Sequence, residues 1–163
     1  MAAATSGTAV VSLPADDQIL ITREFDAPKH LVYKAYTTPE LVRRWWAGRR
    51  GEVTSCEIDF RVGGKWRYVM NAAGGFEVAF NGEFREIVPN ERIVSTEAYE
   101  GAPEGTDPVL NVVKFTETDG RTTLEILTHC GSQATRDAII GSGMESGMQE
   151  GMDIMEEIAI ELR

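Results

Sequence analysis

The sequence of 163 residues has few of the residues that mark disulfide-rich and metal-binding proteins. It contains two cysteines, Cys56 and Cys130, and two histidines, His30 and His129. Because no basic segment precedes the short apolar run at residues 9–11, we expect no secretion signal, and buried free thiols are favoured over a disulfide framework. No stretch reaches the roughly 18 consecutive apolar residues that a transmembrane helix needs. We therefore expect a cytoplasmic protein without a membrane partner.

The scarcity of histidine also limits metal and nucleophilic chemistry. His129 and Cys130 are neighbours, and successive residues of a strand point to opposite faces, so they cannot bind one metal ion together. No zinc-type spacing occurs, and no motif indicates a Cys–His pair with an orienting third group. We predict no metal site, no cofactor and no nucleophilic cysteine.

Carboxylates in or near the predicted strands are the remaining candidates for general acids or bases. A carboxyl group can do this work when it is buried, but Asp and Glu are rarely buried unpaired. Most of the set is therefore expected to be solvated: Glu57, Asp59, Glu83, Glu86 and Glu97. We predict no catalytic residue, and an enzyme is less favoured than a binding protein.

Positive charge is also scarce, with 16 Lys and Arg against 26 Asp and Glu and a formal net charge of −10. Such a chain repels a phosphate backbone, so nucleic acid is not an expected partner. One local exception, residues 43–50, places four arginines around Trp45 and Trp46 and could contact an anion or a protein surface. A solvated segment with buried tryptophans is the favoured interpretation.

What the chain does have is the composition and length of one globular α+β domain, with 42% hydrophobic and 26% charged residues. Residues 1–17 show no sustained period and are predicted to be a flexible tail, followed by one domain over residues 18–163. A strand from about residue 18 precedes two short helices that begin near Pro28 and Pro39. Period-two alternation then predicts several strands, the last two joined by the hairpin signal Asp119-Gly120.

A helical period covers the end of the chain, from about residue 132 to 162, with a possible break near Gly141. Gly143, Gly147 and Gly151 recur every four residues beside a methionine stripe, each at a cost of about 1 kcal/mol relative to Ala in a helix interior. The absent side chains indicate a close approach. Tight packing of the helix on the sheet is favoured over direct contact with a ligand.

Aromatic residues gather on one face of the neighbouring strands. Alternation places Trp66, Tyr68, Phe80 and Phe84 together, opposite the methionines of the helix. Aromatic and thioether groups form adaptable apolar walls, which suits a ligand cavity, while a filled core is the ordinary alternative.

Several segments, taken in order, resemble one known superfamily: residues 25–28 (FDAP), 32–40 (VYKAYTTPE), 45–46 (WW), 59–70 (DFRVGGKWRYVM), 82–94 (GEFREIVPNERIV), 136–138 (RDA) and 142–148 (SGMESGM). They resemble the START-like, or helix-grip, superfamily (also called SRPBCC or Bet v 1-like), in the branch similar to the C-terminal domain of the activator of the 90-kDa heat-shock-protein ATPase. The resemblance covers about residues 19–162. It implies an α+β fold in which a curved antiparallel sheet of six or seven strands grips the last helix around a cavity, with two short helices beside it.

Within this superfamily, the resemblance implies three functions. The favoured hypothesis is non-catalytic binding of a small apolar or aromatic molecule in the cavity. The alternatives are a chaperone-ATPase-activator-like interaction module and a polyketide cyclase/aromatase-like enzyme, which would need polar groups aimed into the cavity. The predicted ligand-binding residues are Trp46, Trp66, Tyr68, Phe80, Phe84, Val113, Met144 and Met148.

Overall fold

An antiparallel sheet and a set of helices account for residues 7–72 and 74–163, the part of the chain that the computed structural model describes. The elements in these residues are β1 (Val10–Ser12), β2 (Gln18–Phe25), α1 (Lys29–Thr37), α2 (Pro39–Trp45), β3 (Gly51–Ile58), β4 (Lys65–Ala72), β5 (Glu77–Val88), β6 (Arg92–Tyr99), β7 (Val109–Thr118), β8 (Arg121–His129), α3 (Gln133–Gly141) and α4 (Met144–Glu161).

The sheet has eight strands among the described residues, in the order β1-β2-β8-β7-β6-β5-β4-β3, against the six or seven expected. One strand that the sequence did not predict is β1, which pairs with β2 in the register Val10↔Thr22. The backbone just before it is bound to α4, because the Gln149 side chain accepts from Ala9 N (3.1 Å) and donates to Ala9 O (2.7 Å). Residues 7–12 of the segment expected to be a flexible tail are thus attached to the domain, while residues 1–6 lie outside the described part.

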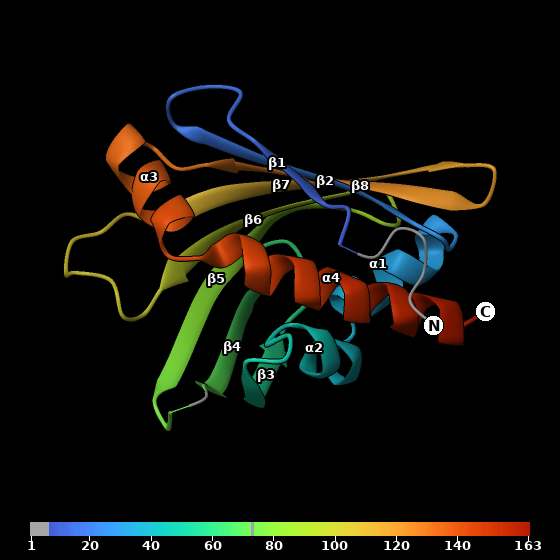
Figure 1. The fold of residues 1–163 in the computed structure, drawn as a ribbon, viewed down its shortest axis with the longest axis horizontal. Helices are drawn as coiled ribbons and strands as arrows, with labels where there is room; N and C mark the ends of the chain where they lie inside the picture. Colours follow the sequence, from blue (N-terminus) through green and yellow to red (C-terminus); the bar gives the residue numbers. More distant parts are fainter. Residues whose placement is uncertain (1–6, 73) are drawn as a thin grey trace.

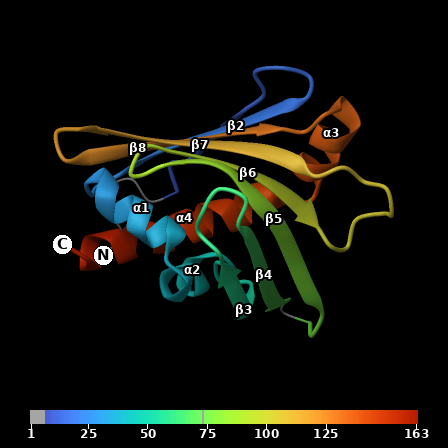
Figure 2. The same ribbon diagram turned by 180° about the vertical axis from the view of Figure 1, so that it is seen from behind.

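Two irregularities and one tight turn shape the sheet. The register shifts between Val53 and Ser55 in β3 and between Phe84 and Glu86 in β5, and such bulges bend a strand and increase its twist. The predicted hairpin between β7 and β8 is confirmed, with positive φ at Asp119 (54°) and Gly120 (77°). Figures 1 and 2 show the resulting curved sheet, which bends around α4.

Helix α4 runs along the concave side of the sheet, with α1 and α2 near its C-terminal end and α3 at the other end (Figure 1). The expected break in the last helical segment is confirmed, since α3 ends at Gly141 and Gly143, at φ 81°, precedes α4. No helix within the described ranges is long and apolar enough to cross a membrane. The arrangement is the α+β helix-grip fold that the resemblance implies.

The glycine strip of α4 faces α2 and the turn that follows it. A Cβ on Gly151 would lie 2.9 Å from the backbone oxygen of Trp45, while one on Gly147 would be 3.8 Å from the Arg50 side chain. In that turn, a Cβ on Gly48 would in turn meet Glu150 of α4 at 3.0 Å. The close approach expected from the sequence therefore exists, but its partner is the α2 segment instead of the sheet.

A buried ion pair fastens α4 to β2. The Arg23 guanidinium, whose side chain is fully buried, donates to Asp153 Oδ1 (2.6 Å) and to Glu156 Oε1 (2.8 Å). The second Glu156 oxygen accepts from the backbone N–H of Asp26 (2.7 Å). Removal of Arg23 would take the guanidinium away from the buried Glu156 carboxylate, which is costly in the core.

Candidate functional site

The space between the sheet and α4 is tightly packed at one end and less so at the other. At the C-terminal end of α4, Met152, Met155 and Ile158 are buried in the main core. One and two turns earlier on the same helix, Met148 and Met144 are only half-buried, although they pack against the same core. The N-terminal half of α4 therefore covers the sheet less completely.

Aromatic rings facing this less covered region form one continuous series of contacts. Trp66 contacts Tyr68 (ring centroids 4.7 Å apart), and Trp46, which follows α2, contacts both Tyr68 (5.4 Å) and Phe80 (5.6 Å). Phe80 then contacts Tyr99 at the end of β6, a residue with 47% of its surface exposed. The structure thus brings together four of the aromatic residues selected from the sequence and adds Tyr99 at the rim.

Two of the selected residues belong to the packed end instead. Phe84 is 7% exposed and packs edge-on against Phe60 (5.1 Å), and Val113 is 1% exposed. Both side chains fill the core between the sheet and the helices, and so does Trp66, which is 6% exposed. All three support the wall without offering surface to a ligand in this conformation. Met144 and Met148, which the sequence places opposite the aromatic series, are half-buried and pack against the main core.

A polar group lies on the same side of the sheet, built from three adjacent strands. The Thr128 hydroxyl of β8 donates to Asn111 Oδ1 of β7 (2.6 Å), and the Asn111 side chain hydrogen-bonds the Glu97 carboxyl of β6. Burial raises the pKa of Glu97, and the bond from Asn111 opposes that shift. Glu97 is therefore an inward-facing carboxyl, which corrects the expectation that it is solvated.

Two tyrosines share the environment of Glu97. The pKa of Tyr36, from α1, and of Tyr68, from β4, is raised, mainly because burial removes them from water and also because the Glu97 carboxylate is near. All three side chains nevertheless keep part of their accessible surface. Tyr36, Tyr68 and Glu97 are therefore shielded from bulk water without being fully packed.

The sequence carries little signal for the inward position of Glu97, which the structure of β6 explains. Ile93 and Ser95 precede it at two-residue intervals, and both are buried, so the alternation of β6 continues inward to Glu97. The opposite face of the strand, with Val94 and Ala98, is the more apolar one in sequence. The polarity pattern of β6 therefore favours the wrong assignment.

Neither cysteine has the lowered pKa of a nucleophilic thiol. Burial raises the pKa of the Cys56 thiol to about 11, which the nearby Arg43 opposes, and burial also raises the pKa of Cys130. A thiol with such a pKa is almost fully protonated at neutral pH and is a poor nucleophile. Among residues 7–72 and 74–163, no cluster of three or more His, Cys, Asp or Glu side chains is placed to hold a metal ion.

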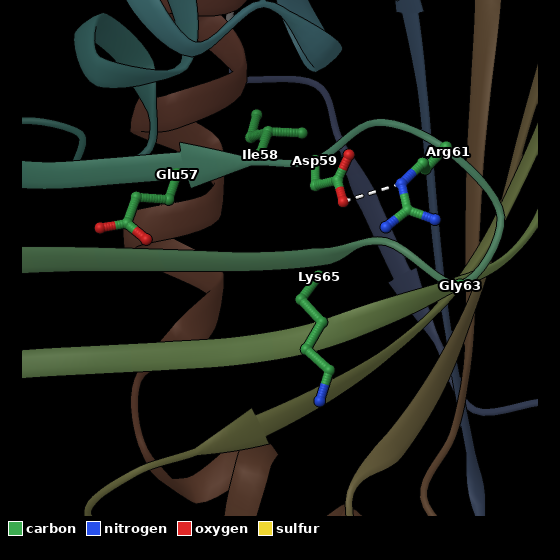
Figure 3. A pocket seen from close by; sticks show the side chains of 6 residues that line it. All are labelled: Glu57, Ile58, Asp59, Arg61, Gly63 and Lys65. Carbon is green, nitrogen blue, oxygen red and sulfur yellow. Dashed lines mark hydrogen bonds and ion pairs between the residues drawn. The ribbon is translucent and has the colours of Figure 1, made fainter.

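A separate, open hollow of about 530 Å³ lies on the surface at the β3–β4 loop (Figure 3), lined by Glu57, Ile58, Asp59, Arg61, Gly63 and Lys65. Arg61 turns back onto Asp59, with Nε 2.9 Å from Oδ2, and Lys65 points away from that pair (Figure 3). Both members of the pair are exposed. The charges at this loop neutralise one another locally and are solvated, as predicted for Glu57 and Asp59.

The arginine-rich segment 43–50 forms the end of α2 and the following turn. Arg44 pairs with Glu161 (3.0 Å) and Arg50 with Glu150 (3.6 Å), so two of its charges meet carboxylates of α4. Trp45 is half-buried, and its indole N–H donates to Ala35 O (2.9 Å). The segment joins α2 to α4 and leaves Trp46 free to contact the aromatic series.

Comparison with known proteins agrees with this architecture. The sequence profile of one family, described as Activator of Hsp90 ATPase homolog 1-like protein, matches residues 26–159. No curated protein matches the sequence significantly.

Solved structures share the fold at identities below 25%. A protein from Rhodobacter sphaeroides matches with a TM-score of 0.84 and 22% identity over 92% of this chain and 96% of its own. A protein from Arthrobacter aurescens matches with a TM-score of 0.82 and 24% identity, over 93% of this chain and 91% of its own. An HSP90 activator from Plasmodium falciparum matches with a TM-score of 0.54 and 24% identity, over 69% of this chain and 72% of its own. Likeness at this level of identity concerns the fold.

Proposed function

The chain belongs to the family of Activator of Hsp90 ATPase homolog 1-like proteins, and from that premise we propose that it binds a small, largely apolar or aromatic molecule between the concave face of the sheet and the N-terminal half of α4. The proposed binding is non-catalytic. The walls would be Trp46, Tyr68 and Phe80, backed by the buried Trp66, on one side and the side chains of Met144 and Met148 on the other.

One observation carries the proposal, namely the difference in packing along the inner face. Met152 and Met155 are buried, whereas Met144 and Met148 of the same helix, and Tyr68 and Phe80 across from them, are half-buried. An apolar surface that is only partly covered is stabilised when an apolar ligand displaces water from it. Methionine and aromatic side chains also adjust to ligands of different shape.

A titration with the neutral apolar fluorophore N-phenyl-1-naphthylamine tests the proposal. We expect its fluorescence to rise on binding and that of Trp46 and Trp66 to be quenched, with a saturable isotherm. Met148→Lys should weaken binding, because it places an ammonium group against the apolar wall. Ile160→Lys, on the same helix at a position with 37% of its surface exposed, is the matched control and should bind as the wild type does. The absence of saturable binding to the wild-type protein would refute the proposal.

A second candidate function is a chaperone-interaction module like that of the activators. It is supported by the family description and by the shared fold of the Plasmodium HSP90 activator. An ATPase assay with the chaperone of the same organism tests it. Stimulation of the ATPase together with a detectable complex would support this function. The absence of both effects at saturating protein would exclude it.

The third candidate, a polyketide cyclase/aromatase-like enzyme, is supported by the polar group at the inner face. Tyr36, Tyr68 and Glu97 provide proton donors and one acceptor next to an apolar space. Incubation with a poly-β-keto thioester tests this role. Product profiles identical to those without protein would exclude cyclisation of that substrate.

A further inference from the structure

The Glu97 carboxyl is unusual because it is removed from bulk water and only the Asn111 side chain opposes the resulting rise in its pKa. It lies on β6 near the phenol groups of Tyr36 and Tyr68, whose pKa its charge helps to raise. The groups that act on Glu97 itself are its own burial and the Asn111 side chain. A buried carboxylate normally has a cation or several hydrogen-bond donors as partners. A carboxylate offers about four lone-pair sites, so one amide leaves most of them available.

The amide that holds Glu97 is itself held in place. The Thr128 hydroxyl, which is buried, donates to Asn111 Oδ1 at 2.6 Å. With its oxygen occupied in this way, the Asn111 side chain presents its NH₂ group to Glu97. The three residues lie on the adjacent strands β6, β7 and β8, whose register pairs Asn111 with Thr128 directly. The carboxyl is therefore positioned by the sheet and not by a mobile loop.

We propose that Glu97, oriented by Asn111 and Thr128, is the polar anchor of the ligand site and accepts a hydrogen bond from a hydroxyl or ammonium group carried by an otherwise apolar ligand. This inference rests on the proposed binding function and adds the chemistry of the ligand's polar end. A neutral hydroxyl and a cationic amine share the donor that the anchor needs. A ligand carboxylate would face the Glu97 carboxyl without a cation between them and would be rejected.

Four naphthalene derivatives of similar size test the anchor: naphthalene, 2-naphthol, 2-naphthylmethylamine and 2-naphthoate. Their affinities are measured by the same tryptophan-quenching titration at one pH and ionic strength. A donor that meets a carboxylate out of water should improve affinity over naphthalene by roughly tenfold or more. We expect this gain for the alcohol, the amine or both, and the pattern between them identifies which donor the site prefers. 2-Naphthoate should bind no better than naphthalene.

Glu97→Gln locates the effect. In this variant, the preferred donor probe should lose most of its affinity advantage over naphthalene. The affinity for naphthalene itself should stay within about twofold of the wild type, because the change removes a charge but little volume. Glu77→Gln, which removes the same charge from an exposed position of β5, is the matched control and should retain the wild-type affinities.

The outcomes separate the anchor from the binding function. Equal affinity for naphthalene and both donor probes, preference for 2-naphthoate, or equal losses in Glu97→Gln and Glu77→Gln would overturn the anchor while leaving the apolar site intact. Failure of all four probes, naphthalene included, would overturn the binding function and the anchor with it.

Discussion

Two glycines of α4, four residues apart, should respond differently to the same substitution. Replacing a glycine in a helix interior by alanine stabilises the helix by about 1 kcal/mol, since alanine has fewer unfolded conformations to lose. At Gly147 the added Cβ would lie 3.8 Å from its nearest neighbour, the flexible Arg50 side chain, so nothing offsets this gain. We expect Gly147→Ala to stabilise the protein by about 1 kcal/mol.

At Gly151 the same Cβ would lie 2.9 Å from the backbone oxygen of Trp45. That carbonyl cannot retreat easily, because it accepts a hydrogen bond from Gly48 N at 3.0 Å in the turn after α2. Overpacking against a fixed group typically costs about 1–3 kcal/mol, which cancels or exceeds the helical gain. Gly151→Ala should therefore range from neutral to about 2 kcal/mol less stable than the wild type.

Thermal unfolding followed by circular dichroism measures both variants under one condition. For a chain of this length, 1 kcal/mol corresponds to roughly 2–4 °C in Tm. Gly147→Ala should raise Tm by about 2–4 °C, and Gly151→Ala should leave it unchanged or lower it by up to about 8 °C. Equal increases in Tm for the two variants would contradict the close contact between α4 and α2.

Three further predictions concern buried groups. Arg23→Met should lower the free energy of unfolding in urea by about 3–5 kcal/mol, because it removes the guanidinium that faces the buried Glu156 carboxylate. A loss below 1 kcal/mol, as for an exposed pair, would contradict the buried arrangement. Cys56, with its pKa raised to about 11, should react with iodoacetamide at pH 8 much more slowly in the folded protein than in urea, and equal rates would show that the thiol is accessible. Burial raises the pKa of Glu97 in the folded state, so ionising this carboxyl costs more free energy in the folded protein than in the unfolded chain. The contribution of Glu97 to stability is therefore greatest at low pH, where it is protonated, and is lost as pH rises through the folded-state pKa. Glu97→Gln should thus be more stable than the wild type at pH 7–8, with a difference that shrinks toward pH 4; a constant difference across this range would show that Glu97 is solvated.

Local patterns in the sequence predict most of the elements but not their full number. The Asp119-Gly120 pair sets a hairpin because both residues adopt positive φ, and Gly143 ends one helix and precedes the next for the same reason. β1 escapes prediction because three residues carry too short a pattern, and its place depends on pairing with β2 and on the Gln149 contacts to Ala9. Such long-range contacts leave no local signal.

Some features of the candidate site are likewise predictable from the sequence and others are not. Alternation correctly groups Trp66 and Tyr68 with Phe80, because a strand places every second side chain on one face. Whether a given apolar residue is partly open or fills the core depends on how the helices cover it, and alternation does not distinguish the half-buried Phe80 from the buried Phe84. Glu97 is harder still, since its inward position requires a partner, Asn111, from another strand.

The direct test of ligand binding at the inner face is a ¹H–¹³C spectrum of protein labelled at the methionine methyl groups, recorded with and without 2-naphthol. Met144 and Met148 flank the proposed space, whereas Met155 is buried in the closed core. A bound naphthalene ring shifts nearby methyl resonances through its ring current. We predict saturable shifts of the Met144 and Met148 methyl signals that exceed those of Met155. Saturable binding of the probe with no shift at Met144 or Met148 would place the ligand elsewhere and contradict the account.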